Sequence, residues 1–254
     1  MLIARSLVFN VLFYLTLIVI MVFGLPAILF GRRGVLGLAR AWSYSSNWLL
    51  RTICGLDAEY RGVENIPSGG IIFAAKHQST WETFSLLRFA DDFSFILKRE
   101  LTFIPLFGWY LLRANQIAIN RTGGSALQEA TTKSREVLRQ GRQIFIFPEG
   151  TRRPAGAPPA YKFGVAKIYE ETQAVCVPVA LNSGLFWSRK SFLKRPGTIL
   201  VEFLEPIQPG LTRAEFFTLL SERLEAATNR LIDESIRRDP SLRRMLANIP
   251  EGPA

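Results

Sequence analysis

The sequence predicts an α/β fold, a mixed, mostly parallel sheet covered by helices, preceded by an N-terminal membrane-embedded helix or two-helix hairpin. Three observations lead to this prediction. No charged residue occurs from residue 6 to residue 31. After residue 56, short apolar runs alternate with helical patterns, as in strands joined by covering helices. A chain of 254 residues, 48% of them hydrophobic, is long enough to bury the core of such a domain.

The uncharged N-terminal stretch has the length of a membrane helix. It reads SLVFNVLFYLTLIVIMVFGLPAILFG, and about 20 apolar residues span a bilayer core of roughly 30 Å. A secretory signal peptide has an apolar region of roughly 7–15 residues and a small-residue cleavage site, and this stretch fits neither feature. Arg32, Arg33 and Arg40 follow it and only Arg5 precedes it. The positive-inside rule therefore predicts that the following chain lies at the cytoplasmic face of the inner (plasma) membrane.

A second segment, residues 35–56, is less apolar and rich in aromatic residues. It contains Trp42, Tyr44 and Trp48, interrupted by Arg40 and Arg51. Because Trp and Tyr favour the headgroup level and Arg can reach up to it, this pattern indicates an interfacial amphipathic helix returning from the first. A helix packed on the soluble domain is the alternative. A spanning first helix and a hairpin embedded in one leaflet both remain open.

The rest of the chain is organised as one domain. We expect strands at residues 58–61, 71–75, 93–97, 116–120, 143–147, 174–181 and 198–203. We expect helices at residues 80–89, 124–140 and 163–170, and a long one to about residue 236. Thr212 and Glu215 predict a capping box at the start of that last helix. The predicted organisation is an anchoring segment at 1–55, an α/β domain at 56–236 and a basic, peripheral tail at 237–254.

Charge and composition limit the function classes. Lys and Arg number 31 against 21 Asp and Glu, a net charge of +10, which favours nucleic acid, an anionic membrane or a phosphorylated substrate as partner. The positive mean hydropathy of +0.16 favours the membrane over nucleic acid. One histidine and two cysteines exclude multi-histidine and four-cysteine metal sites. GxGxxG, Walker and GxSxG motifs are absent from the sequence, which argues against nucleotide binding and serine hydrolysis.

The first candidate for chemistry is the segment KHQSTWE, residues 76–82, directly after an expected strand. Ligand crevices open at strand ends of α/β sheets, and histidine is the usual general base near neutral pH. His77 and Glu82 would lie on different faces of one continuous helix, so they meet only if His77 is in the loop and Glu82 in the first helical turn. Glu82 as a helix cap with Ser79, and His77 as an ordinary loop histidine, are the alternatives.

The second candidate is the segment FPEGTRR, residues 147–153, which also follows an expected strand. A turn with free backbone N–H groups and two arginines can hold an anion, although it can equally be an ordinary turn with solvated arginines. Lys98 and Arg121 lie at other strand ends. With Arg152, they are candidates to bind a phosphate near His77.

These segments together resemble a known family. His-x4-acid, Lys-x-x-Leu-x-x-x-Pro from Lys98, Ile-x-Arg ending at Arg121, Phe-Pro-Glu-Gly-Thr-Arg and Val-Pro-Val at 177–179 occur in that order. The chain from about residue 56 to 205 resembles the glycerolipid acyltransferases, specifically the 1-acylglycerol-3-phosphate (lysophosphatidic acid) acyltransferase family. It departs from the usual family pattern at two positions, with Glu82 in place of Asp and Ala118 in place of Phe.

The resemblance implies an activity and its mechanism. His77 would take the proton of the sn-2 hydroxyl of lysophosphatidic acid, and the oxygen would attack the thioester of acyl-CoA or acyl carrier protein, giving phosphatidic acid. Glu82 would hold the imidazole tautomer. Cys54 and Cys176 lie outside the motifs and are interpreted as apolar packing residues. No cofactor, metal or nucleic acid partner is implied, and an anionic membrane surface would attract the basic protein.

The resemblance also implies a phosphate site. Its members are Lys98, Arg121, Glu149, Gly150, Thr151 and Arg152. Since the Glu149 carboxylate would repel a phosphate, we expect it to bind an arginine or backbone groups instead. The alternatives are the same chemistry on another lysolipid, such as a lyso-ornithine lipid, a membrane-bound hydrolase, a non-catalytic membrane adaptor or a nucleic-acid-binding protein.

Overall fold

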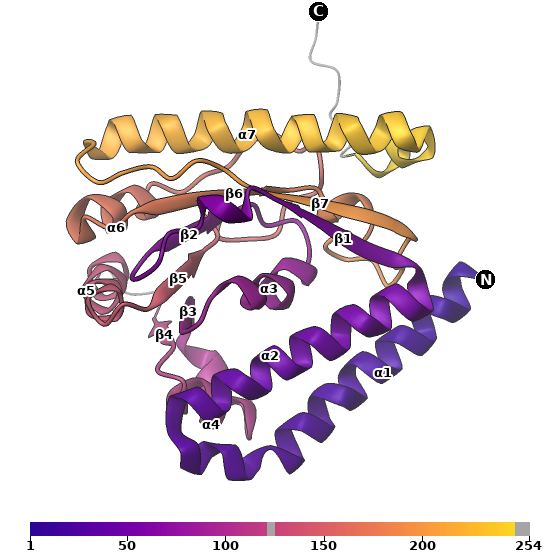
Figure 1. Ribbon diagram of the computed structural model, residues 1–254, viewed down its shortest axis with the longest axis horizontal. Coiled ribbons are helices and arrows are strands. Elements are labelled where there is room, and N and C mark those ends of the chain that lie inside the picture. The colour runs from indigo at the N-terminus through magenta and orange to yellow at the C-terminus, as the bar shows by residue number, and fades with distance from the viewer. Residues whose placement is uncertain (121–124, 247–254) are drawn as a thin grey trace, which may run out of the picture.

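The computed structural model describes residues 1–120 and 125–246, which form a sheet with helices on both faces (Figure 1). The strands are β1 (Leu56–Arg61), β2 (Ile72–Ala75), β3 (Phe93–Lys98), β4 (Ile117–Ile119), β5 (Gln143–Ile146), β6 (Cys176–Leu181) and β7 (Gly197–Phe203). The helices are α1 (Leu2–Phe23), α2 (Gly31–Leu49), α3 (Trp81–Ser85), α4 (Phe107–Arg113), α5 (Ala126–Arg139), α6 (Gly164–Thr172) and α7 (Arg213–Arg238). Every expected strand forms, with its ends shifted by no more than two residues.

The sheet is mixed and mostly parallel, which confirms the predicted fold class. Its strand order is β1-β7-β6-β2-β5-β3-β4. The five strands from β6 to β4 are parallel, and β7 pairs antiparallel with β6 and parallel with β1. The carboxyl ends of β2, β3, β5 and β6 therefore share one edge of the sheet, where ligand crevices form in α/β folds.

Alternation along the strands divides the interior into two cores. In β2, Phe73 and Ala75 pack on the side of α1, α2 and α3, while Ile72 and Ala74 pack on the side of α5, α6 and α7. Successive side chains of a strand point to opposite faces, so a strand covered on both sides is apolar throughout. The same alternation sends His77 and its neighbour Lys76 to opposite sides of the sheet.

The N-terminal apolar stretch is shorter as a helix than predicted. The α1 helix ends at Phe23, and a 3-10 turn, Leu25–Phe30, reverses the chain into α2. Pro26 lies at the start of this turn and lacks the N–H that a continuing helix needs. A Cβ at Gly24 would lie 2.5 Å from a methyl carbon of Leu38, so this glycine allows the two helices to approach closely. The segment 6–31 is therefore one arm of a hairpin and its turn.

The hairpin packs on the α/β domain. Phe13 of α1 contacts Phe84, with ring centroids 5.6 Å apart, and both rings belong to the core that also contains Phe73. On α2, Asn47 Oδ1 accepts hydrogen bonds from Trp81 Nε1 at 3.0 Å and from Ser85 Oγ at 2.7 Å. The second segment therefore packs on the domain, as the alternative interpretation expected, and its place at the membrane interface stays a prediction. The predicted anchor and domain share one hydrophobic core.

The remaining helices match the sequence analysis in type, with differences at their ends. The expected helix at 80–89 consists of α3 followed by a 3-10 turn, Leu86–Phe89. The α7 helix begins with the predicted capping box of Thr212 and Glu215. After α7, Leu242 is buried within the 3-10 turn Pro240–Met245. The expectation of a wholly peripheral tail is therefore wrong for this turn. The sequence analysis did not predict α4.

Candidate active site

The loops that follow β2, β5 and β6 bring the first candidate residues together at the carboxyl edge of the sheet. His77 follows β2, the Phe147–Arg153 segment follows β5, and Ser183 follows β6. The Arg153 N–H donates to the backbone oxygen of His77 at 2.7 Å, which joins the first two loops directly. Because β2 lies between β5 and β6, the histidine occupies the middle of this edge.

His77 contacts Glu82 as the spacing predicted, from a loop to the first turn of α3. The distance from His77 Nδ1 to Glu82 Oε1 is 3.0 Å. The same oxygen accepts from the backbone N–H groups of Gln78 at 2.7 Å and Ser79 at 2.6 Å. Glu82 therefore caps the start of the helix and also binds the imidazole. Its interpretation as a helix cap and its interpretation as the partner of His77 are compatible. A carboxylate only accepts, so this contact selects the neutral tautomer of the imidazole with the proton on Nδ1 and a free lone pair on Nε2.

The other Glu82 oxygen has a partner that the sequence analysis missed. Ser183 Oγ donates to Glu82 Oε2 at 2.8 Å, and both side chains are buried. Next to it, the Gly184 N–H donates to Gln78 Oε1 at 2.9 Å. The signal in the sequence was the polar pair Asn182-Ser183 directly after an apolar strand. The strand order that places β6 beside β2 was not available from the sequence.

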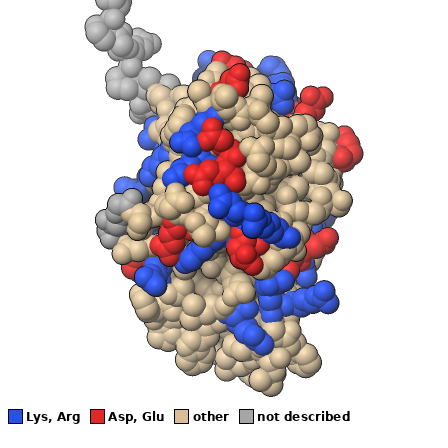
Figure 2. Space-filling model, turned by 90° about the vertical axis from the view of Figure 1, so that its left-hand side faces the viewer, with Lys and Arg blue, Asp and Glu red and all other residues tan. Residues whose placement is uncertain are grey.

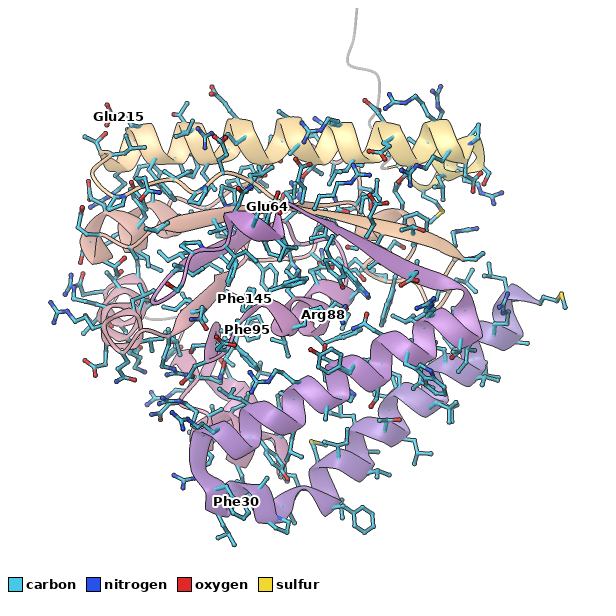
Figure 3. The ribbon with its side chains drawn as sticks, in the orientation of Figure 1. Phe30, Glu64, Arg88, Phe95, Phe145 and Glu215 are labelled. Atoms are coloured by element: carbon cyan, nitrogen blue, oxygen red, sulfur yellow. The ribbon has the colours of Figure 1, made fainter. Side chains whose placement is uncertain are left out.

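Phe147 fixes the plane of the histidine ring. The two rings are stacked, with centroids 4.1 Å apart and an interplanar angle of 18°. Phe147 in turn stacks with Phe95. Phe95 also stacks with Phe145 on the neighbouring strand (Figure 3). A ring held by a carboxylate at Nδ1 and by an aromatic face has little freedom to turn, which keeps Nε2 in one place.

Arg152 lies close to the histidine loop. Its guanidinium donates to Thr80 Oγ1 at 2.5 Å. Gly150 has φ of +65°, in the left-handed region that favours glycine, and its N–H donates to the Phe147 oxygen at 2.9 Å. This tight turn directs Arg152 back toward the loop that carries His77.

Glu149 points away from these residues. It is 1% exposed, and its Oε1 accepts from Lys76 Nζ at 3.2 Å. Lys76 also donates to Glu225 of α7 at 2.7 Å, and Tyr161 donates to the same Glu225 oxygen at 2.5 Å. The expected arginine or backbone partner of Glu149 was therefore wrong. Lys76 takes that place because chain alternation turns its side chain toward α7.

A cavity of about 1020 Å³ contains His77 in its wall. Its polar lining residues include Thr80, Lys98, Thr151, Arg152, Lys162 and Arg189. Most of the remaining wall is apolar and comes from α1, α2, β3, α4, α5 and α6. Lys98, Gly150, Thr151 and Arg152 thus line the cavity, while Glu149 is not among the lining residues. Arg121, the other expected member, lies outside the described residues.

Other kinds of catalytic centre find little support in the described part of the chain. Within residues 1–120 and 125–246, no group of three or more His, Cys, Asp or Glu side chains is placed to hold a metal ion. Cys54 and Cys176 are free and buried in the two cores, which confirms their interpretation as packing residues. Burial raises the pKa of the Cys176 thiol well above its usual range, which disfavours the reactive thiolate.

Comparison with known proteins identifies the domain. Residues 57–182 match the family model described as Acyltransferase. The chain is 40% identical over 161 residues to a 1-acyl-sn-glycerol-3-phosphate acyltransferase of Pseudomonas aeruginosa, covering 63% of each protein. It is 28% identical over 171 residues to a chloroplastic 1-acyl-sn-glycerol-3-phosphate acyltransferase of Arabidopsis thaliana, covering 65% of this chain and 47% of the relative. The alignments with these two relatives span less than two thirds of the relatives' own length.

A solved structure extends the likeness to nearly the whole chain. The crystal structure of the 1-acyl-sn-glycerophosphate acyltransferase PlsC from Thermotoga maritima superposes with a TM-score of 0.75 at 25% sequence identity. The match covers 91% of this chain and 98% of that one. Together with the family match across the histidine and Phe-Pro-Glu-Gly-Thr-Arg segments, this shows that residues 57–182 form an acyltransferase domain within a chain of the same overall fold.

Proposed function

We propose that this protein transfers a fatty acyl group from acyl-CoA or acyl carrier protein to the sn-2 hydroxyl of lysophosphatidic acid, forming phosphatidic acid. The observation that carries this proposal is the placement of His77. Its Nδ1 is held by buried Glu82, and the ring lines a mostly apolar cavity whose wall also contains Lys98 and Arg152, the latter bound to Thr80 of the histidine loop. A phosphorylated alcohol with a long acyl chain has this same distribution of charge and apolar surface. The names of the relatives support the same acceptor.

The chemistry proceeds by direct transfer. His77 Nε2 accepts the proton of the substrate hydroxyl as the oxygen attacks the thioester carbonyl carbon. The tetrahedral intermediate then expels the sulfur, and the imidazolium returns its proton to the leaving thiolate. Glu82 stabilises the imidazolium through Nδ1–H and keeps the productive tautomer. General-base catalysis of this kind contributes about 10²–10⁴-fold.

The basic end of the cavity binds the phosphate. Arg152 and Lys98 would contact it directly, with Arg121 as a further contact, and Gly150 and Thr151 would shape the turn beside it. We revise the role of Glu149, which is bound to Lys76 on the far side of the sheet. In this position it holds the loop that carries Arg152 and does not touch the phosphate. The apolar part of the cavity would hold acyl chain.

The hairpin would place the protein at the cytoplasmic face of the inner membrane. In the described residues, α1 is long and apolar enough to cross a bilayer by length and composition. It nevertheless packs along the domain, from Ser6 at Lys194 to Met21 at Tyr110. This arrangement favours insertion of the hairpin into one leaflet. Basic residues would add about 1 kcal/mol each of attraction to anionic lipid where they approach the surface.

Acyl transfer by the purified, detergent-solubilised protein tests the proposed function. Labelled lysophosphatidic acid is offered with acyl-CoA or acyl carrier protein, and the product is compared between the wild type and His77→Ala. We expect phosphatidic acid from the wild type alone. Absence of product from folded wild type with both donors would instead direct the search to another lysolipid, such as lyso-ornithine lipid. Equal product from His77→Ala would refute the general-base mechanism.

Replacing Arg152 with glutamine should weaken acceptor binding. The loss of a charge-assisted hydrogen bond to phosphate costs about 1.5–3 kcal/mol, which predicts a KM for lysophosphatidic acid about tenfold or more higher. The KM for the acyl donor should change little. Steady-state kinetics with each substrate varied in turn measure both effects. Arg230→Gln, an exposed position on α7, is the matched control and should leave both constants unchanged.

A further inference from the structure

A second apolar surface lies outside the hairpin. The segment 101–112, which contains all of α4 except its last residue, Arg113, has no charged residue, and we call it the α4 segment. It exposes large apolar side chains, with Phe103 75%, Trp109 55% and Leu112 59% accessible. Exposed apolar side chains gathered in this way mark an interaction surface, because soluble proteins keep such patches small.

The α4 segment adjoins the turn of the hairpin. Tyr110 Oη donates to the Met21 oxygen at 2.6 Å, and Arg113 Nε donates to the Ile28 oxygen at 2.8 Å. The hairpin turn itself exposes Leu29 and Phe30, at 82% and 78%. Phe30 points outward at the tip of the hairpin in Figure 3, and Figure 1 places α4 beside that tip. Two segments far apart in the sequence therefore lie side by side at one largely apolar end of the molecule.

Charge surrounds this apolar end and is nearly absent from it. Figure 2 shows charges of both signs over the upper and middle part of one face, an almost uncharged lower end, and Lys or Arg side chains along much of the border. In the sequence, Lys98, Arg99 and Arg113 flank the α4 segment, with Glu100 as the acidic neighbour. An apolar surface with Trp and a mainly basic border matches an anionic phospholipid leaflet, with acyl chains below and phosphates at the rim.

We propose that the α4 segment is a second membrane-inserting element, which enters the same leaflet of anionic phospholipid as the hairpin. This inference rests on the proposed function and goes further by naming a lipid contact in the α/β domain itself. The cavity wall draws on both elements, Tyr14 and Leu17 of α1 and Leu101 and Leu111 of the α4 segment. When the hairpin and the α4 segment are both inserted, this part of the cavity lies at the depth of the acyl chains of the membrane lipids.

Spin labels at Phe103→Cys and Leu112→Cys test the proposal in the full-length protein. The two natural cysteines are buried, at 1% and 0% exposure, so labelling is selective. Asn229→Cys, exposed on α7 across the sheet, is the matched control. In vesicles of phosphatidylglycerol and phosphatidylcholine, the labels at 103 and 112 should collide with dissolved oxygen in preference to a water-soluble nickel chelate. We expect the ratio of the oxygen collision rate to the nickel-chelate collision rate to be several-fold higher at positions 103 and 112 than at position 229.

Three results would overturn the proposal. One is equal access of the nickel chelate to positions 103, 112 and 229 in vesicles. Another is spin–spin broadening between labels in detergent that grows with protein concentration, which would assign the surface to a second copy of the chain. The third uses no cysteine: brominated lipid should quench wild-type tryptophan fluorescence more than that of Trp109→Phe, and equal quenching refutes insertion. These readouts need no acyl transfer, so an inactive but inserted protein would refute only the proposed function.

Discussion

Replacing Glu82 with glutamine is expected to lower kcat by about 10³–10⁴-fold while the protein stays folded. The amide oxygen of glutamine can still accept from the N–H groups of Gln78 and Ser79, and its NH₂ can donate to Ser183 Oγ, so the helix start keeps its partners. The amide is neutral, however, and cannot stabilise the imidazolium that forms in the proposed mechanism as His77 takes the proton. Turnover at saturating acceptor and donor measures the loss, and thermal unfolding of the same sample checks the fold.

Ser183→Ala is the matched control for this prediction. It removes one hydrogen bond to Glu82 but leaves the carboxylate charge and the contact with His77 Nδ1. The expected loss in kcat is about tenfold or less, since one hydrogen bond to a charged group contributes about 1.5–3 kcal/mol and part of that affects stability alone. A Glu82→Gln variant as active as Ser183→Ala would contradict the imidazolium role and leave Glu82 as a helix cap.

Local sequence patterns predicted the parts of the fold that local interactions form. Each expected strand was an apolar run bounded by turn residues, and each one forms. A hairpin was among the predictions, but its turn was not located within residues 6–31, because the hydropathy of this stretch is uniform. The break depends on backbone chemistry at Pro26 and on the close approach at Gly24. The order of the strands depends on pairing between residues far apart in the chain, and no local pattern in the sequence predicted it.

In the candidate site, too, some contacts could be predicted from local spacing and others depend on the tertiary fold. His77 and Glu82 are five residues apart, and their contact across a loop and a first helical turn could be predicted from spacing. Ser183 reaches Glu82 only because β6 lies beside β2. The true partner of Glu149 depends on the alternation that turns Lys76 toward α7, and on the position of α7 over the sheet. These contacts come from tertiary packing, which no short motif records.

Replacing Lys76 with methionine is expected to destabilise the protein by about 3–5 kcal/mol, the cost of removing one partner from a buried ion pair. Lys76 and Glu149 are 3% and 1% exposed, and Glu149 Oε2 has no hydrogen-bond partner among the described residues. Without Lys76, the Glu149 carboxylate would lose its ammonium partner, and Glu225 would keep only Tyr161. Urea unfolding of both proteins under the same conditions measures the difference.

Two further variants decide whether burial of charge is the cause. Lys133→Met removes an exposed lysine that pairs with Glu129 at 2.7 Å, and it should cost about 0.5 kcal/mol or less. Adding Glu149→Leu to Lys76→Met removes both partners of the buried pair, so no uncompensated carboxylate remains there, and most of the lost stability should return. If the double variant were as unstable as Lys76→Met, the lysine would act through packing against Tyr161, over whose ring its Nζ lies at 5.0 Å. Recovery of stability in the double variant would instead show that the buried Glu149 carboxylate is tolerated because Lys76 compensates its charge.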